Sequence, residues 1–442
     1  MDTTAQNPQA LEVRDSPCWS VASRAVFRLC FVYFGLFCLC TQVLGGLFPI
    51  PAVDIPDPSV LLPPIRQSVF WVAARIFHAK LPLVYTGSGS GDKTFDWVLA
   101  FCLLVVATVA TGIWSVLDRK RENYIALYKW FRVFVRFALA SQLLAYGMAK
   151  VIPLQMPFPY LAKLVEPFGN FSPMGVLWAS IGASPAYETF AGCAETLAGV
   201  LLIFPRTTML GALVCAADMT QVFVLNMTYD VPVKLFSFHL LLMAVFLLAP
   251  DLQRLADFFF RERAVAPPKP MRLFHSQRGN RIALGAQILY GICLLAANAY
   301  DGWTNWHVYG GGSPKSPLYG IWDIKELAID AQERSPLLTD YQRWRRTIFD
   351  SPERMSLERM DDSLVRYNAA INSNDKTIML TKSADKNWKG DFTYQRPAEN
   401  QLILDGKMDG HKIHMEMQLL ERGQFVLVNR GFHWVQEYPF NR

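Results

Sequence analysis

Four polar side chains interrupt the first half of an apolar stretch, NMTYDVPVKLFSFHLLLMAVFLLAP, at residues 226–250. They are Asn226, Asp230, Lys234 and His239. Charge inside a membrane costs free energy unless it is paired or faces water. Asp230 and Lys234 are four residues apart, so their side chains can pair along a helix. The stretch predicts a membrane-spanning helix with one polar half.

Three preceding apolar segments also have polar side chains at a similar predicted depth. Glu188 and Glu195 are seven residues apart, close to two helical turns, and therefore share a helix face. The remaining side chains are Tyr146, Lys150, Gln155, Tyr187, Asp218 and Gln221. Four helices that contribute acids, bases and amides at one depth predict a shared site in the outer half of the membrane.

Binding of a quinone is the chemistry that suits this set best. A quinone has an apolar tail and two carbonyl oxygens, so it needs hydrogen-bond donors and carboxylates that take protons when the quinol is oxidised. Candidates for catalytic roles are Lys150, Glu188, Glu195, Asp230, Lys234 and His239. Candidates for binding the quinone are Tyr146, Gln155, Tyr187, Asp218, Gln221 and Asn226. Two alternatives stay open: a polar network that only holds the helices together, and ion transport.

The sequence argues against several other chemistries. A membrane haem with two axial histidines needs both at matching depth, and only His239 lies inside an apolar segment. His411 and His414 are three apart in a predicted strand, so they point to opposite faces and make a poor metal pair. Neither HExxH nor GxSxG occurs. We therefore expect no haem, no metal and no nucleic-acid partner.

Seven apolar segments are long enough to cross a membrane, in a chain of 442 residues of which 52% are hydrophobic. A crossing helix needs about 20 residues. The segments are 25–48, 95–117, 132–148, 184–204, 209–225, 233–248 and 282–299. The fold class predicted is an α-helical integral membrane bundle of about seven transmembrane helices, followed by a mostly-β soluble domain.

The distribution of positive charge predicts the orientation in the membrane. Basic residues are frequent in DRKRENYIALYKW at 118–130 and in the loop 254–278. By contrast, Lys163 is the only Lys or Arg in residues 151–183. Under the positive-inside rule, the amino terminus is cytoplasmic and the carboxy-terminal domain is extracytoplasmic. We expect a multi-pass protein of a bacterial inner membrane, in contact with membrane lipids.

Two amphipathic stretches are expected to lie on the membrane surface. IRQSVFWVAARIFHA at 65–79 places apolar residues at helical spacing and predicts an interfacial helix on the outer side. APDLQRLADFFFRERA at 249–264 predicts a second surface helix on the cytoplasmic side.

The end of the chain is predicted to be rich in strands. From about Ser356, apolar and polar residues alternate in seven short stretches separated by turns such as SNDK, PAEN and DG. Strands in series predict a meander, either a small barrel or a curled sheet. The last stretch, RGFHWVQEYPFNR at 430–442, is predicted as a final strand with a packed Trp434. The alternative is a plug over the outer mouth of the bundle.

Residues 125–250 resemble the DoxX family of membrane proteins. The resemblance comes from RVFVRFALASQLLAYGMAK at 132–150, ETFAGCAETLAGVLLIFPRTTMLGA at 188–212 and LLLMAVFLLAPD at 240–251. Arg136, Lys150 and Glu195 occupy the matching positions. The resemblance implies a four-helix membrane module whose relatives include quinone-reducing subunits and members of membrane redox-stress complexes. It also implies a redox partner subunit.

The sequence therefore predicts a membrane redox component that binds a quinone, with an enzymatic role left open. The alternative is a non-catalytic membrane-anchored protein whose exported β domain binds a lipid or protein partner. The predicted regions are a cytoplasmic tail (1–24), two spans with a long outer loop (25–124), the DoxX-like module (125–250), a surface helix with the seventh span (251–299), a linker with a partly helical segment (300–355) and the β-rich domain (356–442).

Overall fold

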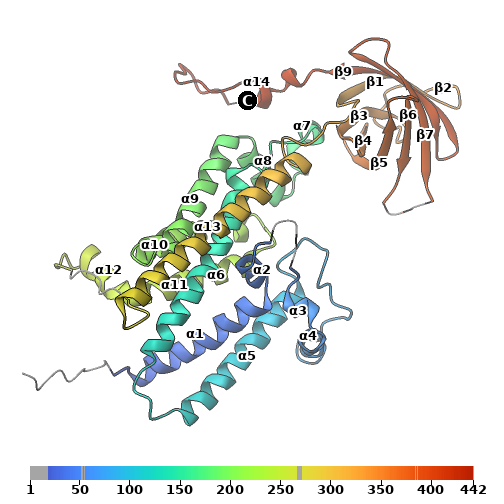
Figure 1. Cartoon of the computed structure of the whole chain (residues 1–442). Helices are drawn as coiled ribbons and strands as arrows, with labels where there is room; N and C mark the ends of the chain where they lie inside the picture. Colours follow the sequence, from blue (N-terminus) through green and yellow to red (C-terminus); the bar gives the residue numbers. More distant parts are fainter. Residues whose placement is uncertain are drawn as a thin grey trace, which may run out of the picture. The chain divides into compact units, whose positions relative to one another are not determined.

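The computed structural model describes residues 18–50, 53, 55–265, 271–383, 385 and 387–441, so most of the predicted tail 1–24 lies outside the described residues. The chain forms two compact units (Figure 1). One consists of Met1–Gly147 with Ala194–Ala299, and the other of Met148–Cys193 with Tyr300–Arg442. Each unit combines stretches distant in sequence, unlike the consecutive regions that the sequence predicts.

Long apolar helices dominate the first part of the chain. Within the described residues, six helical stretches are long and apolar enough to cross a membrane. They contain α1 (Val21–Cys40), α5 (Thr94–Leu117), α9 (Pro185–Ile203), α10 (Thr208–Thr228), α11 (Lys234–Leu248) and α13 (Gln277–Val308). The predicted segment 132–148 lies in α6 (Ile125–Val151), which is long enough but more polar, and α6 is not among the six.

Shorter helices connect the long ones. They are α2 (Val43–Leu47), α3 (Pro58–Leu61), α4 (Pro63–Arg75), α7 (Leu161–Val165), α8 (Pro173–Gly182) and α12 (Leu252–Phe259), with 3-10 turns η1 (Phe168–Asn170) and η2 (Ala249–Asp251). Helix α12 falls within the predicted surface stretch 249–264, and α4 overlaps the stretch 65–79 but begins two residues before it. The first predicted span, 25–48, is interrupted because Thr41 has an extended backbone, and the chain resumes helical structure in α2.

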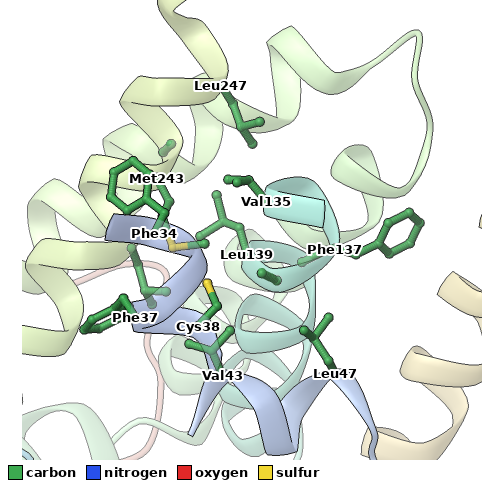
Figure 2. Packing of buried hydrophobic residues seen from close by; sticks show 14 of the residues in the cluster. Phe34, Phe37, Cys38, Val43, Leu47, Val135, Phe137, Leu139, Met243 and Leu247 are labelled. Carbon is green, nitrogen blue, oxygen red and sulfur yellow. The ribbon is translucent and has the colours of Figure 1, made fainter. Parts of the chain in front are cut away.

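The core of the helical unit forms where α1, α6 and α11 meet (Figure 2). Phe34 and Cys38 of α1 pack with Leu139 of α6 and Met243 of α11, and all four side chains are buried. A helix enclosed by other helices need not be apolar on every face.

Arg136, a polar residue in α6, binds the end of α9. Its buried guanidinium donates from Nε to the carbonyl of Leu202 at 2.8 Å and from Nη2 to the carbonyl of Ile203 at 2.6 Å. Both carbonyls lie at the end of α9, where the last turn of a helix leaves carbonyl groups without intrahelical donors. A cation at that end also meets the negative pole of the helix dipole. Arg136 therefore joins α6 to the end of α9.

The end of the chain folds as an eight-stranded antiparallel β-barrel (Figure 1). Its strands are β1 (Gly320–Ile329), β3 (Trp344–Ser351), β4 (Arg354–Arg359), β5 (Leu364–Asn372), β6 (Thr377–Thr381), β7 (Lys389–Gln395), β8 (Gln401–Met408) and β9 (His411–Leu420). Neighbours in sequence pair with one another, and β2 (Gln332–Glu333) only extends the hairpin after β1. Pairing of β1 with β9, from Ile321 opposite Leu420 to Ile329 opposite Ile413, closes the barrel.

Side chains fill the inside of this barrel. The fully buried ones are Trp322, Leu327, Phe349, Leu380, Leu402, Leu404 and Met415. Along β7, buried and exposed residues alternate strictly, as the sequence predicts for a strand with one face on a core. Of the two sheet architectures predicted, the barrel is the one present.

The strand prediction is correct in the middle of this region and wrong at both ends. Strands β5 to β9 occur as predicted, including the Asp409–Gly410 turn, whose positive φ angles suit a two-residue hairpin. Residues 320–351, expected to be partly helical, form β1 and β3, and residues 301–308 continue α13. Conversely, the predicted strands after Leu420 are replaced by η3 (Arg422–Gln424), α14 (Val426–Asn429) and irregular chain.

Helix α7 packs against the outer wall of the barrel. Leu161 of α7 is buried with Ile321 of β1 and Ile348 of β3. The Asp350 carboxylate accepts from the Leu161 amide at 2.8 Å and the Ala162 amide at 3.3 Å, so it caps the start of α7. Burial raises the pKa of Asp350 even though these amides favour its charged form. The loop between α6 and α9 is thereby bound to the barrel.

Candidate functional site

The two compact units divide the twelve predicted site residues. Lys150, Gln155, Tyr187 and Glu188 belong to the unit that contains the barrel. The other eight belong to the helical unit: Tyr146, Glu195, Asp218, Gln221, Asn226, Asp230, Lys234 and His239. We describe each group separately.

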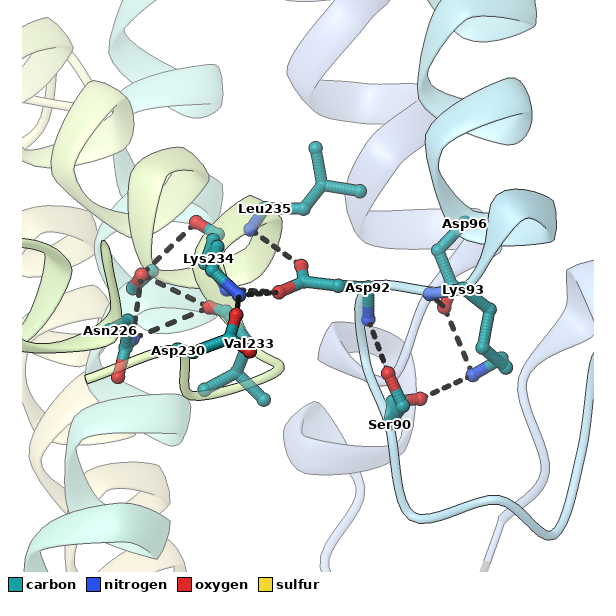
Figure 3. A network of polar contacts seen from close by, with 10 residues as sticks. Ser90, Asp92, Lys93, Asp96, Asn226, Asp230, Val233, Lys234 and Leu235 are labelled. Carbon is teal, nitrogen blue, oxygen red and sulfur yellow. Dashed lines mark hydrogen bonds and ion pairs between the residues drawn. The ribbon is translucent and has the colours of Figure 1, made fainter. Parts of the chain in front are cut away.

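Lys234 has the acidic partner that the sequence predicts (Figure 3). Its Nζ lies 2.9 Å from Oδ1 of Asp230. A second carboxylate, Asp92, lies 3.8 Å from the same nitrogen and accepts from the backbone amides of Lys234 and Leu235 at 2.8 and 2.9 Å. Asp92 therefore caps α11 and fastens the glycine-rich loop before α5 to it. No local pattern in the sequence points to Asp92, which is 142 residues from Lys234.

Asn226 joins the end of α10 to α11. Its Nδ2 donates to Oγ of Ser237 at 3.0 Å, and Ser237 in turn donates to the carbonyl of Val233 at 3.0 Å. Both polar side chains are buried. A buried amide requires such partners, so Asn226 has a structural role here.

The buried His239 pairs with Tyr33 of α1, which is partly buried. Nδ1 lies 2.7 Å from the carbonyl of Leu235, and Nε2 lies 2.7 Å from the hydroxyl of Tyr33. A carbonyl only accepts, so Nδ1 has the proton, and in a neutral ring Nε2 accepts from the tyrosine hydroxyl. The imidazole also stacks on Phe37 at 4.0 Å between ring centroids. Neither aromatic partner was predicted from the sequence.

Glu188 binds backbone within the other unit. It is fully buried, and Oε1 accepts from the Met156 amide at 2.8 Å. Lys150 interacts electrostatically with it, whereas Tyr187 is exposed. The carboxylate therefore holds the loop that contains Gln155 and Met156.

Tyr146, Glu195 and Asp218 form the remaining group in the helical unit. Glu195 interacts electrostatically with both Tyr146 and Cys215, and Asp218 interacts with Cys215. Glu195 is buried and Gln221 is exposed. Glu195 is thus close enough to act on Tyr146 and Cys215, and Asp218 is close enough to act on Cys215.

A cavity of about 240 Å³ lies beside Tyr146 in the helical unit. Its apolar wall consists of Phe37, Leu99, Ala100, Leu103, Leu235 and Phe236. Its polar side consists of Thr41, Gln42, Asp57, Ser59, Ser90, Lys93, Asp96 and Tyr146. Four long helices, α1, α5, α6 and α11, contribute to it. Of the predicted site residues, Tyr146 is the one that lines the cavity.

Hydrogen bonds fix the polar side of the cavity. Nε2 of Gln42 donates to the Tyr146 hydroxyl at 2.9 Å, which leaves the hydroxyl hydrogen of Tyr146 free to donate elsewhere. Lys93 lies 2.9 Å from Asp96 and donates to the Ser90 carbonyl at 2.6 Å. The cavity lining thus combines apolar side chains with polar side chains that hydrogen bonds hold in place. This arrangement suits a flat ring that has hydrogen-bond acceptors.

The barrel offers a different kind of surface. A hollow of about 450 Å³ on it is lined by Ala328, Ala331, Asp405, Gly406, Lys407, Lys412, Ile413 and His414. Nδ1 of His414 lies 2.6 Å from Asp405, and this hydrogen bond raises the pKa of His414. Within the described residues, no three His, Cys, Asp or Glu side chains are grouped to hold a metal ion.

Comparison with known proteins gives one relationship. No protein-family profile and no solved structure matches the chain. The Uncharacterized protein YwoB of Bacillus subtilis (strain 168) is 32% identical over 127 residues, which are 29% of this chain and 80% of the relative. This chain therefore belongs to the same family as YwoB.

Proposed function

We propose that this protein is a multi-pass membrane protein that binds a quinone ring in the cavity beside Tyr146 and takes part in membrane redox chemistry. The observation that supports the proposal is the combination of Tyr146, Phe37 and Phe236 around one cavity of about 240 Å³. Sites that enclose a whole drug-sized ligand have about 300–1,000 Å³. A smaller cavity fits one substituted ring and leaves an apolar tail among the helices or in lipid.

Tyr146 is the proposed donor to a quinone carbonyl oxygen. The Gln42 amide donates to the hydroxyl oxygen of Tyr146, so the hydroxyl hydrogen can point to the ligand. Phe37 and Phe236 supply aromatic surface for the ring. Oxidation of a quinol releases two electrons and two protons. In this proposal a redox partner subunit takes both electrons, Glu195, which interacts electrostatically with Tyr146, accepts one proton, and water accepts the other.

Seven crossings are part of the proposal, with α6 as the seventh. Gly91, just before α5, donates to the carbonyl of Pro232 at 2.8 Å, and Asp92 caps α11. The starts of α5 and α11 are therefore at one membrane face. The chain between them runs through α5, α6, α9 and α10, and only an even number of crossings returns it to that face. This count favours a crossing α6.

The same reasoning applies to the barrel. Helix α7 contacts the barrel, and four long apolar helices, α9, α10, α11 and α13, lie between them in sequence. Four crossings return the chain to one face, in agreement with the contact. The basic loop 118–123 follows α5 at the opposite face, so the positive-inside rule favours an extracytoplasmic barrel in a bacterial inner membrane.

A second candidate is a non-catalytic protein whose barrel binds a partner. Lys234, Asn226 and Glu188 support this reading, because each makes hydrogen bonds that hold helices or loops together. In that case the functional surface is on the barrel, where the hollow at His414 lies.

Mass spectrometry of lipids extracted from the purified protein separates the two candidates. Wild type should contain quinone. Tyr146→Phe should retain roughly five- to tenfold less, because one hydrogen bond contributes about 1 kcal/mol. Ala100→Leu, which fills the cavity, should abolish retention. Glu188→Gln, in the other unit, should leave it unchanged. Equal quinone content in folded wild type and Ala100→Leu would favour the second candidate.

A further inference from the structure

The last described residues, 426–441, form a segment with many exposed aromatic side chains. Phe432 is 77% exposed, Trp434 91% and Tyr438 85%. Val435 is also exposed. The prediction of a final strand with a packed Trp434 is therefore wrong: the segment contains the short helix α14 and irregular chain. Large apolar side chains gathered at such exposure mark a surface that binds something.

The outer wall of the barrel does not share this composition. Along the strands from β1 to β9, Met379 is the one large hydrophobic side chain among the described residues that is exposed. Outside the strands, exposed large hydrophobic side chains of the described barrel domain lie in the C-terminal segment and at Leu337, Leu338 and Tyr341 in the loop before β3. The barrel closes without residues 426–441, so its fold does not explain the aromatic residues of this segment.

The segment begins beside the loop between α6 and α9. Phe425 packs against the cluster formed by Leu161, Ile321 and Ile348, and the Arg422 guanidinium lies 5.2 Å from the ring centre of Phe158. Phe158 and Leu161 follow α6 by a few residues, where the proposed bundle leaves the membrane. The C-terminal segment therefore starts at the membrane face of its own unit.

Exposed aromatic residues also mark the helix ends at this face. Tyr187 and Phe190 lie near the start of α9, and Trp303 and Tyr309 lie near the end of α13. Trp and Tyr favour the membrane–water interface, where the ring is in apolar surroundings and the polar group is hydrated. Trp434 and Tyr438 have the same chemistry.

We propose that residues 426–441 bind the outer surface of the lipid bilayer and hold the barrel against it. Phe432, Trp434, Val435 and Tyr438 enter the interfacial layer, and Arg430 lies beside them for contact with lipid phosphate groups. The occupant of this aromatic surface is the bilayer, since the segment starts where the chain leaves it. This proposal does not depend on quinone binding.

Photo-crosslinking in native membranes tests the proposal on the full chain. Trp434 is replaced by p-benzoylphenylalanine, and Met379 on β6 is replaced in the same way as the exposed control. After irradiation, mass spectrometry should find lipid adducts at position 434 at least about fivefold more often than at 379. Adducts mainly to protein, or equal lipid labelling at both positions, would overturn the proposal.

Protease access gives a second measurement. In membrane vesicles with the barrel accessible, trypsin cuts after Arg430 only when the segment is off the bilayer. The variant with Phe432→Ser, Trp434→Ser, Val435→Ser and Tyr438→Ser should be cut roughly tenfold faster than wild type. The substitutions replace exposed side chains, so the barrel keeps its core. Equal cleavage rates would contradict a bilayer-bound segment.

Discussion

At the scale of single residues, most buried polar groups of the helical unit hold backbone or one another. Asp92, Asn226 and His239 each bind a backbone group or a side chain on a neighbouring helix. A polar group buried without a partner costs about 1–3 kcal/mol, so these contacts are needed for the helices to pack. Tyr146 differs, because it lines a cavity and its hydroxyl hydrogen is not used in the hydrogen bond from Gln42.

Arg136 provides a test of such a structural role. We expect Arg136→Met to destabilise the protein by about 2–3 kcal/mol, because two charge-assisted hydrogen bonds to α9 are lost. Arg132→Met on the same helix should cost below about 1 kcal/mol, since Arg132 makes a long ion pair of 3.7 Å with Asp251. Unfolding in detergent measures both. Equal destabilisation by the two substitutions would refute the role of Arg136 in binding the end of α9.

His414 predicts a pH dependence in the barrel. Asp405 raises the pKa of His414 above its usual value of about 6.5, and Glu416 acts in the same direction. The charged imidazole thus stabilises the folded barrel fully below about pH 6.5, and this contribution is lost as the pH rises through the higher folded pKa.

Hydrogen exchange of β8 and β9 in the full chain, corrected for intrinsic rates, measures this effect. Wild type should lose protection as the pH rises above about 6.5. His414→Gln should lose less over the same range. The same loss in both proteins would show that another group titrates.

At the scale of elements, hydrophobic runs made the long helices predictable. Their ends agree with the predicted segments within a few residues, except for α1, α6 and α13. Strands β1 and β3 were missed because IWDIKELAID and WRRTIFD mix charged side chains with Trp and Ile, which hides the alternation. The C-terminal segment was predicted as a strand because aromatic residues favour strands, yet its side chains meet no core.

The contact between α7 and the barrel can be tested at this scale. Asp350→Ala removes the acceptor of two amides at the start of α7, so hydrogen exchange of residues 160–166 should accelerate. Asp350→Asn keeps an acceptor oxygen and removes the charge that burial disfavours, so its effect should be smaller. Asp361→Ala, on an exposed turn, is the control. No change in Asp350→Ala would mean that apolar packing alone holds α7.

At the scale of the whole molecule, the partners of the site residues could not be read from the sequence. The pairing of Asp230 with Lys234 is local and was predicted from a four-residue spacing. Tyr33 is 206 residues from His239, and Gln42 is 104 residues from Tyr146. Such pairs depend on how the helices assemble, and no local pattern contains that information.

The orientation of the whole chain across the membrane can be tested by fusions. Seven crossings with a cytoplasmic amino terminus place residues after 308 outside and the loop 118–123 inside. Alkaline phosphatase, which is active only when exported, should be active when fused after residue 320 and inactive when fused after residue 121. The reverse pattern would invert the orientation. The same result at both positions, activity at both or inactivity at both, would mean that α6 does not cross.

Photolabelling with an azido-quinone in native membranes tests the central claim most directly. The label should map to the cavity lining: residues 37–42 of the first helical region, 99–103 of α5, Tyr146 of α6, or 235–236 of α11. Ala100→Leu should remove this labelling while the protein remains folded. Labelling spread over lipid-facing positions, or unchanged in Ala100→Leu, would contradict a quinone site in this cavity.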